Sequence, residues 1–183
     1  MSREEAVREL QKNIANRNLL NHCYAVEAIM RGLASHFGED EEIWGLAGLL
    51  HDIDYEETKD DPARHSLVGG EMLEKLGLSN EIVYAVKCHN GQHGLERKGL
   101  MDKALFAADP LSGLIVAGAL IRPEKKLAVV ETDFLIKRFK EKGFARGANR
   151  EQIASCTDMD LSLEEFITIG LDSMKKIAVE IGL

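Results

Sequence analysis

A histidine and an aspartate stand side by side at the end of an apolar stretch. His51 and Asp52 follow Ile43–Leu50, which is apolar throughout. An imidazole and a carboxylate at the edge of a core each cost free energy unless a partner satisfies them. A metal ion satisfies both at once, and this predicts further ligands elsewhere in the chain.

Four more side chains of ligating types lie in segments with helical, largely apolar patterns: His22, His65, His89 and Asp109. One histidine on an apolar helix face is more often a core residue than a ligand. An aspartate in the same setting is costly without a cation or donors. Imidazole and carboxylate ligands together suit divalent Fe, Mn, Co, Ni or Zn, and carboxylates also suit Mg. We expect one or two such ions, the first held by His22, His51, Asp52 and Asp109.

A second ion is expected at His65 and His89, with the two oxygens of Asp52 bridging the pair. Helices must position these ligands, because every strong apolar period in the chain is near 3.6 residues. Predicted helices cover residues 3–15, 19–37, 41–50, 62–76, 81–88, 100–120, 133–141, 151–156 and 163–181. The polar segment 55–61 reads as a loop. The fold class is therefore all-α.

The chain has 183 residues and a formal net charge of −8. This length suits one domain over residues 1–183, with a metal-binding core at about 18–120 and C-terminal helices 123–183 packed on it. The charge argues against a broad nucleic-acid-binding face, so we expect a small-molecule partner, no nucleic acid and no membrane. No signal peptide or membrane-length apolar run is apparent, and Cys23, Cys88 and Cys156 form no spaced pair. We expect a cytoplasmic protein.

The ordered set His22, His51-Asp52, His65, His89 and Asp109 resembles the HD-domain superfamily of metal-dependent phosphohydrolases. The stretch Leu49–Asp54 (LLHDID) resembles its signature, with Ile53-Asp54 in place of the commoner Ile-Gly. The resemblance implies a helical bundle with metal ligands at His22, His51, Asp52 and Asp109. His65 and His89 resemble the extra ligands of the two-metal subset. Asn90 replaces the second histidine of the cyclic-di-GMP subgroup, which makes that substrate less favoured.

The function that this resemblance implies is hydrolysis of a nucleotide or other small phosphate ester. Metal ions lower the pKa of water and polarise a phosphoryl oxygen. Asp52, Asp54 and His93 are the candidate catalytic residues, and Arg146 and Arg150 are candidates for binding the phosphate. Two alternatives stay open on the same ligands: a di-iron oxygenase, and a metal- or nucleotide-binding regulatory domain without turnover.

Overall fold

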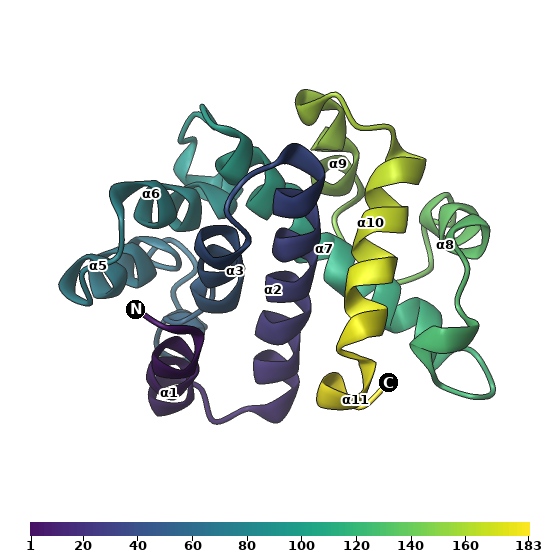
Figure 1. Ribbon diagram of the computed structural model, residues 1–183, viewed down its shortest axis with the longest axis horizontal. Coiled ribbons are helices and arrows are strands. Elements are labelled where there is room, and N and C mark those ends of the chain that lie inside the picture. Colours follow the sequence, from purple (N-terminus) through teal and green to yellow (C-terminus); the bar gives the residue numbers. More distant parts are fainter.

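Every regular element in the computed structural model, which describes all 183 residues, is a helix (Figure 1). The prediction of an all-α fold is confirmed. The α-helices are α1 (Arg3–Asn13), α2 (Arg17–Phe37), α3 (Glu41–Leu50), α4 (Tyr55–Thr58), α5 (Leu67–Lys75), α6 (Asn80–His89), α7 (Leu100–Leu120), α8 (Thr132–Phe139), α9 (Arg150–Ala154), α10 (Leu163–Lys176) and α11 (Ala178–Ile181). Short 3-10 turns cover Gly91–His93, Leu127–Val129 and Ser155–Met159.

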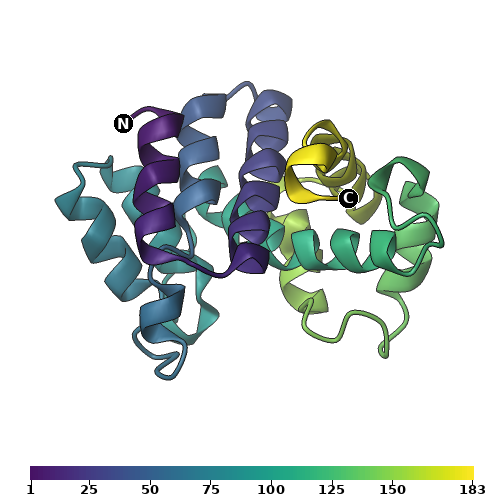
Figure 2. The ribbon, with the colours of Figure 1, turned by 90° about the horizontal axis from the view of Figure 1, so that it is seen from below.

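Helix α2 is the central element, because it packs on α3, α7 and α10 (Figure 1). Its N-terminus is capped by Asn16, whose side chain accepts bonds from the amides of Asn18 and Leu19. Helices α1, α2 and α3 lie side by side in Figure 2. Gly48 lets α3 approach α2 closely, since a Cβ there would lie 2.8 Å from the Val26 carbonyl oxygen. This close approach brings the end of α3 beside His22.

One apolar cluster of 45 buried residues runs through the molecule, from Ala6 in α1 to Ile181 in α11. The helices of residues 18–120 and those of 123–183 therefore share a core. Trp44 and Phe166 are its largest fully buried side chains.

The chain around His65 differs from the predicted helix 62–76. Residues 62–66 form turns, and α5 begins only at Leu67. The physical reason is Ser66, which has a left-handed backbone (φ 69°) and gives its amide to the Asp54 carboxylate at 2.8 Å. His65 therefore projects from a turn. Residues 55–58, expected in a loop, form the single turn of α4.

Helix α7 is long and apolar enough to cross a membrane by length and composition alone, although no such run was expected from the sequence. Most of its most apolar 18-residue window, 61%, is buried inside the protein. A core helix passes the same test, and α7 packs against α2, α6 and α9. It carries Asp109, which is partly exposed, to a position beside His22.

Candidate metal centre

Two of the histidines are placed in the same way, at the C-terminal ends of α3 and α6. The Nδ1 atom of His51 lies 2.8 Å from the Gly48 carbonyl, and that of His89 lies 2.6 Å from the Val86 carbonyl. Both carbonyls lie three residues back, one helical turn away. A carbonyl only accepts, so each Nδ1 must carry the proton. The Nε2 atoms are left facing the centre of the cluster, where both side chains are buried.

Asp52 lies between the imidazoles and is itself buried. Its Oδ1 atom is 3.5 Å from the Nε2 of His51, 3.3 Å from that of His65 and 3.4 Å from that of His89. Its Oδ2 atom is 3.6 Å from the Nε2 of His22. The carboxylate therefore reaches both halves of the cluster.

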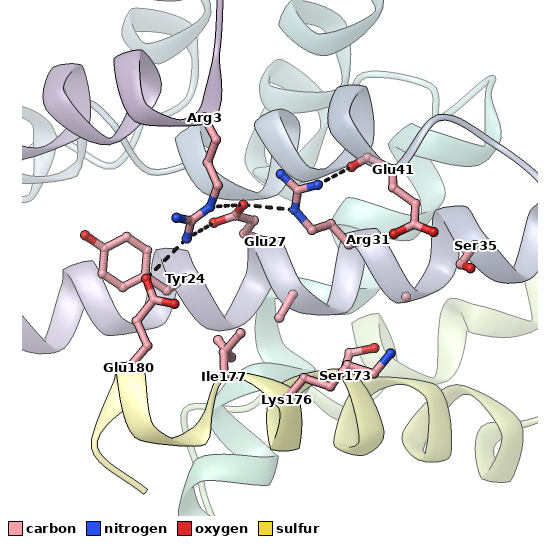
Figure 3. A pocket seen from close by; sticks show the side chains of 12 residues that line it. Arg3, Tyr24, Glu27, Arg31, Ser35, Glu41, Ser173, Lys176, Ile177 and Glu180 are labelled. Carbon is pink, nitrogen blue, oxygen red and sulfur yellow. Dashed lines mark hydrogen bonds and ion pairs between the residues drawn. The ribbon is translucent and has the colours of Figure 1, made fainter.

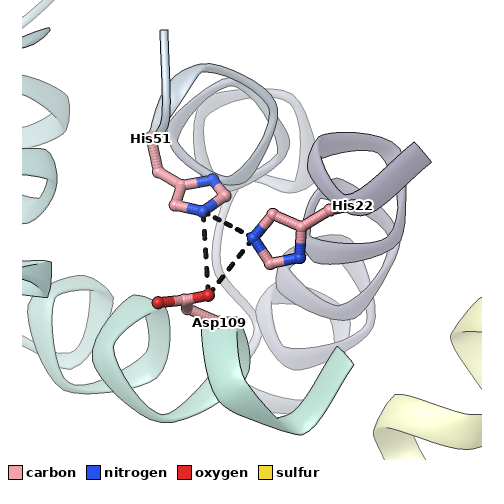
Figure 4. A group of neighbouring side chains, drawn as sticks. All are labelled: His22, His51 and Asp109. Carbon is pink, nitrogen blue, oxygen red and sulfur yellow. Dashed lines mark hydrogen bonds and ion pairs between the residues drawn. The ribbon is translucent and has the colours of Figure 1, made fainter. Parts of the chain in front are cut away.

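His22 from α2 and Asp109 from α7 complete the other half (Figure 4). The Nε2 atom of His22 lies 3.2 Å from Asp109 Oδ1 and 3.1 Å from the Nε2 of His51. Its Nδ1 is 2.9 Å from the hydroxyl of Ser112, which donates its own proton to the Asp109 carbonyl. Ser112 must then accept from Nδ1, and so it fixes the same tautomer in His22.

His65 reaches the cluster from its turn, with Nε2 3.2 Å from the Nε2 of His89. Its Nδ1 donates to Asp54 at 3.1 Å. Asp54 is buried, and its carboxylate fits because residue 69 is glycine: a Cβ there would lie 3.0 Å from Asp54 Oδ1. Gly69 therefore makes room for this carboxylate, whereas the adjacent Gly70 makes room for the side chain of Lys87.

All four imidazoles thus have an acceptor on Nδ1 and turn Nε2 inward, which is the usual arrangement of metal-binding histidines. The two Nε2–Nε2 separations of 3.1 and 3.2 Å bring lone pairs together unless a proton or a cation lies between them. Two sets of three residues could each hold an ion, because the donor atoms within each set lie within 4.8 Å of one another. The first set is His22, His51 and Asp109, and the second is His51, Asp52 and His89. The chemistry and geometry of these donors fit a divalent cation, so the chain contains groups that could hold metal.

The electrostatics follow from burial and from the two carboxylates. Burial lowers the pKa of His51 to about 4, so this imidazole is neutral at pH 7. Burial also lowers the pKa of His65, but hydrogen bonds to Asp52 and Asp54 outweigh it and raise this pKa to about 10. Although burial disfavours its charged form, Asp52 keeps a pKa well below its ordinary value, because His51, His65 and His89 face it. A metal ion would displace protons from this cluster.

The structure gives two of the expected catalytic residues other partners. Asp54 is turned away from the hollow over the ligands and binds His65 and the amide of Ser66, so it orients a ligand and is not placed as a general acid. His93 uses its Nε2 to donate to the carbonyl of His65 at 2.7 Å. It supports the turn that carries His65 rather than the reaction.

The two arginines expected to bind phosphate also lie elsewhere. The guanidinium of Arg150 donates to four backbone carbonyls, those of Phe139, Phe144, Ala145 and Ala148, and it holds the 139–149 loop together. Arg146 is exposed and lines none of the hollows beside the ligands. Neither arginine therefore lies beside the ligands in this structure, because the fold of this loop sets the positions of both.

Three hollows meet at the ligands. One of about 410 Å³ opens over His22, Asp52, His65 and Asp109. It shares His65 and Asp109 with a hollow of about 660 Å³ toward α9, and Asn18 and His22 with one of about 600 Å³ toward α11. We refer to these three neighbouring hollows together as the groove.

Ser112 contacts the ligand His22 and Arg97 lines a hollow beside the ligands, although the sequence predicted a role for neither residue. Ser112 lies three residues after Asp109 on the same helix, and this spacing was a usable signal. Arg97 lines the 660 Å³ hollow, with its Cζ atom 3.8 Å from the centre of the Phe106 ring. It is the only lysine or arginine in the groove. Nothing in the local sequence distinguishes it from its neighbour Lys98.

A family model described as "HD domain" matches residues 19–118. The protein named Ribonuclease Y from Oleidesulfovibrio alaskensis is 29% identical over 133 residues, 72% of this chain and 24% of the relative. Ribonuclease Y from Acetivibrio thermocellus is 27% identical over 177 residues, 90% of this chain and 32% of the relative. The chain therefore spans about a quarter to a third of these relatives. No solved structure matches it.

An uncharacterized protein of Methanocaldococcus jannaschii is 31% identical over 149 residues, which are 75% of this chain and 85% of that protein. The relatives named Ribonuclease Y contradict the expectation of a small-molecule partner and no nucleic acid, because that name denotes an enzyme acting on RNA. The expectation rested on net charge, which sums over the whole surface. A groove contacts only its own lining, whatever the remaining surface carries.

Proposed function

The chain belongs to the HD-domain family of metal-dependent phosphohydrolases, and on that premise we propose that it hydrolyses phosphodiester bonds in short nucleic-acid strands, single-stranded RNA above all. The observation that carries this proposal is the groove. It continues on both sides of the ligand cluster, by about 660 Å³ toward α9 and about 600 Å³ toward α11. A phosphodiester has a substituent on each side of phosphorus, whereas a monoester needs room on one side only.

The relatives named Ribonuclease Y support the same substrate class. The low positive charge of the groove limits the proposed substrate to a short strand. Affinity for a nucleic-acid backbone grows with the number of phosphates that cations neutralise, and Arg97 is the one cation in the lining. We therefore expect weak binding outside the cleavage site, with little dependence on salt.

The residues have distinct tasks in this proposal. One or two divalent ions would be held by four imidazoles and two carboxylates, with Asp52 between the two halves. The imidazoles are those of His22, His51, His65 and His89, and the carboxylates are those of Asp52 and Asp109. Bound ions would lower the pKa of water and polarise a phosphoryl oxygen. Asp52 and Asp109 supply negative charge that offsets the charge of the ions. Asp54 and Ser112 hold the imidazoles of His65 and His22 in their ligating orientation.

The test is a substrate panel on protein loaded separately with Mn²⁺, Fe²⁺, Co²⁺, Ni²⁺, Zn²⁺ or Mg²⁺. We expect cleavage of bis(p-nitrophenyl) phosphate and of a single-stranded RNA oligonucleotide, and slower release of phosphate from p-nitrophenyl phosphate. An oxygen electrode run on the iron-loaded protein separates hydrolysis from oxygenase chemistry. Oxygen uptake with no phosphoester cleaved under any metal would refute the proposal.

A further inference from the structure

The hollow toward α9 holds an arginine that no carboxylate neutralises. The backbone on each side of Arg97 is fixed: Tyr84 donates its hydroxyl to the carbonyl of Glu96 at 2.7 Å, and the amide of Lys98 donates to Asp102 at 3.1 Å. The guanidinium lies 3.8 Å from the Phe106 ring centre. Arg97 has no ion pair within 4 Å, so the fold orders this side chain without using its charge.

The position of Arg97 is tied to the ligand cluster through α7. Phe106, on which the guanidinium rests, lies three residues before Asp109, and residues at this spacing share a helix face. Phe106 and Asp109 both line the 660 Å³ hollow. A guanidinium packed by its face on an aromatic ring leaves the N–H groups on its edge available. Those groups match a phosphate with two parallel hydrogen bonds.

The neighbouring polar groups are also unused by the fold. The side-chain amides of Gln92 and Gln152 line the same hollow and make no hydrogen bond to protein. In contrast, Asn90 is fully engaged, since it donates to the carbonyls of Pro62 and His65 and accepts from the amide of Gln92. The hollow therefore offers one free cation and two free amides beside the cluster. Two acids also line this hollow: Asp109, which belongs to the ligand cluster, and Glu151, which is exposed on α9 and opposes an anion there.

We propose that Arg97 binds a second phosphate of the substrate, the one next to the phosphate held at the metal centre. This inference rests on the proposed function and narrows it to substrates with two consecutive phosphates, such as a dinucleotide carrying a terminal phosphate or a longer strand. The single cation explains why one flanking phosphate is bound and no more. Gln92 and Gln152 then face the sugar or base between the two phosphates.

The test compares substrates that differ only in the second phosphate: ApA, 5′-phosphorylated pApA and 3′-phosphorylated ApAp, with bis(p-nitrophenyl) phosphate as a one-phosphate diester. We expect the wild type to cleave pApA or ApAp with a lower KM than ApA. Arg97→Gln, which keeps a polar side chain over Phe106 without the charge, should raise that KM about 10- to 100-fold. The same variant should raise KM for bis(p-nitrophenyl) phosphate and ApA much less, because neither substrate carries a second phosphate.

Arg8→Gln is the matched control. Arg8 is exposed on α1, away from the groove, and its substitution changes the net charge by the same amount. Equal effects of Arg97→Gln on one- and two-phosphate substrates, or no advantage of the second phosphate in the wild type, would overturn the proposal.

Binding measured without turnover separates this inference from the proposed function. In an Asp52→Asn background, titration calorimetry with pApA, ApAp and ApA should show a preference for one phosphorylated dinucleotide that Arg97→Gln removes. If the wild type cleaves no diester but this preference is present, the proposed reaction fails and the phosphate site stands. If Asp52→Asn binds all three dinucleotides alike, the site is refuted whatever the activity.

Discussion

Helix α2 contributes residues to two clusters of polar and charged side chains: Glu27 and Arg31 to one, and His22 to the ligand cluster. The two clusters satisfy their buried groups in opposite ways. Glu27 is buried, and its two carboxylate oxygens accept from Arg3 at 2.7 and 2.9 Å and from Arg31 at 3.0 Å (Figure 3). Arg3 also reaches Glu180, and Arg31 reaches Glu42 at 2.7 Å. Every charge in this arginine–glutamate cluster has a partner within the protein.

The ligand cluster on the other side of α2 has no such closure. Each imidazole donates its Nδ1 proton to an acceptor outside the cluster. Inside the cluster, the Nε2 atoms and the carboxylate oxygens face one another. The hollow beside the arginine–glutamate cluster has a volume of about 290 Å³. Its lining includes Arg3, Glu27, Arg31 and Glu180, which pair with one another, and also Glu41 and Lys176. This comparison indicates that a buried cluster of charged side chains predicts a bound ligand only when its donors and acceptors do not all pair within the protein.

The largest effect should come from removing the carboxylate that faces all four imidazoles. Asp52→Asn should reduce phosphodiester cleavage by on the order of 10³-fold or more, because ligand and charge are both lost. Helical circular dichroism at 20 °C should be unchanged. Asp172→Asn, an exposed aspartate on α10, is the control and should keep full activity. Substantial cleavage by Asp52→Asn would mean that the reaction occurs elsewhere.

Asp54 tests whether the outer partner of a ligand matters. Asp54→Asn removes the carboxylate that accepts from Nδ1 of His65, so the affinity for a divalent ion should fall about 10- to 100-fold. Isothermal titration calorimetry with the metal ion measures this affinity. Asp60→Asn, at an exposed aspartate, is the control. An unchanged affinity, with the fold intact, would remove His65 from the ligand set.

Glu27→Gln should affect stability instead of activity. The change leaves Arg3 and Arg31 without their shared carboxylate, and the free energy of unfolding should fall by about 2 kcal/mol, less than for a fully buried pair because both arginines are partly exposed. Urea unfolding measures this loss. Glu180→Gln, which removes only an exposed pair, should cost less than about 1 kcal/mol. A loss of turnover in folded Glu27→Gln would show that the two clusters are coupled.

The smallest effect is a release of protons on metal binding. Without metal His65 has a pKa of about 10 and the pKa of His22 is also raised, since carboxylates outweigh burial at both. At pH 7 the imidazole of His65 holds a second proton that a metal must displace. Metal affinity should therefore fall as pH falls, about tenfold per pH unit for each proton released. Calorimetry in buffers of different ionisation enthalpy counts these protons. No release would contradict protonated imidazoles in the metal-free cluster.

The sequence predicted well what depends on local pattern. The bounds of α3 and α7 coincide with the predicted helices 41–50 and 100–120. Asp40 caps the start of α3, and a continuous apolar period marks the extent of α7. Helix α10 begins at residue 163 as predicted, and a capping box of Ser162 and Glu165 marks its start. Prediction failed at His65, where a long-range bond from Ser66 to Asp54 replaces a helical start.

By itself, then, the sequence determined the helical class and the types and order of six possible ligands, since both follow from residue identity and spacing. The tertiary structure alone decided which polar groups are already satisfied. Asp54, His93 and Arg150 resembled free functional groups, yet each binds a partner contributed by a neighbouring turn or loop. Arg97 has no such partner, and only the packing of its loop on α7 places its charge beside the ligands. Hydrogen-bond partners distant in sequence are set by folding, and local spacing carries no record of them.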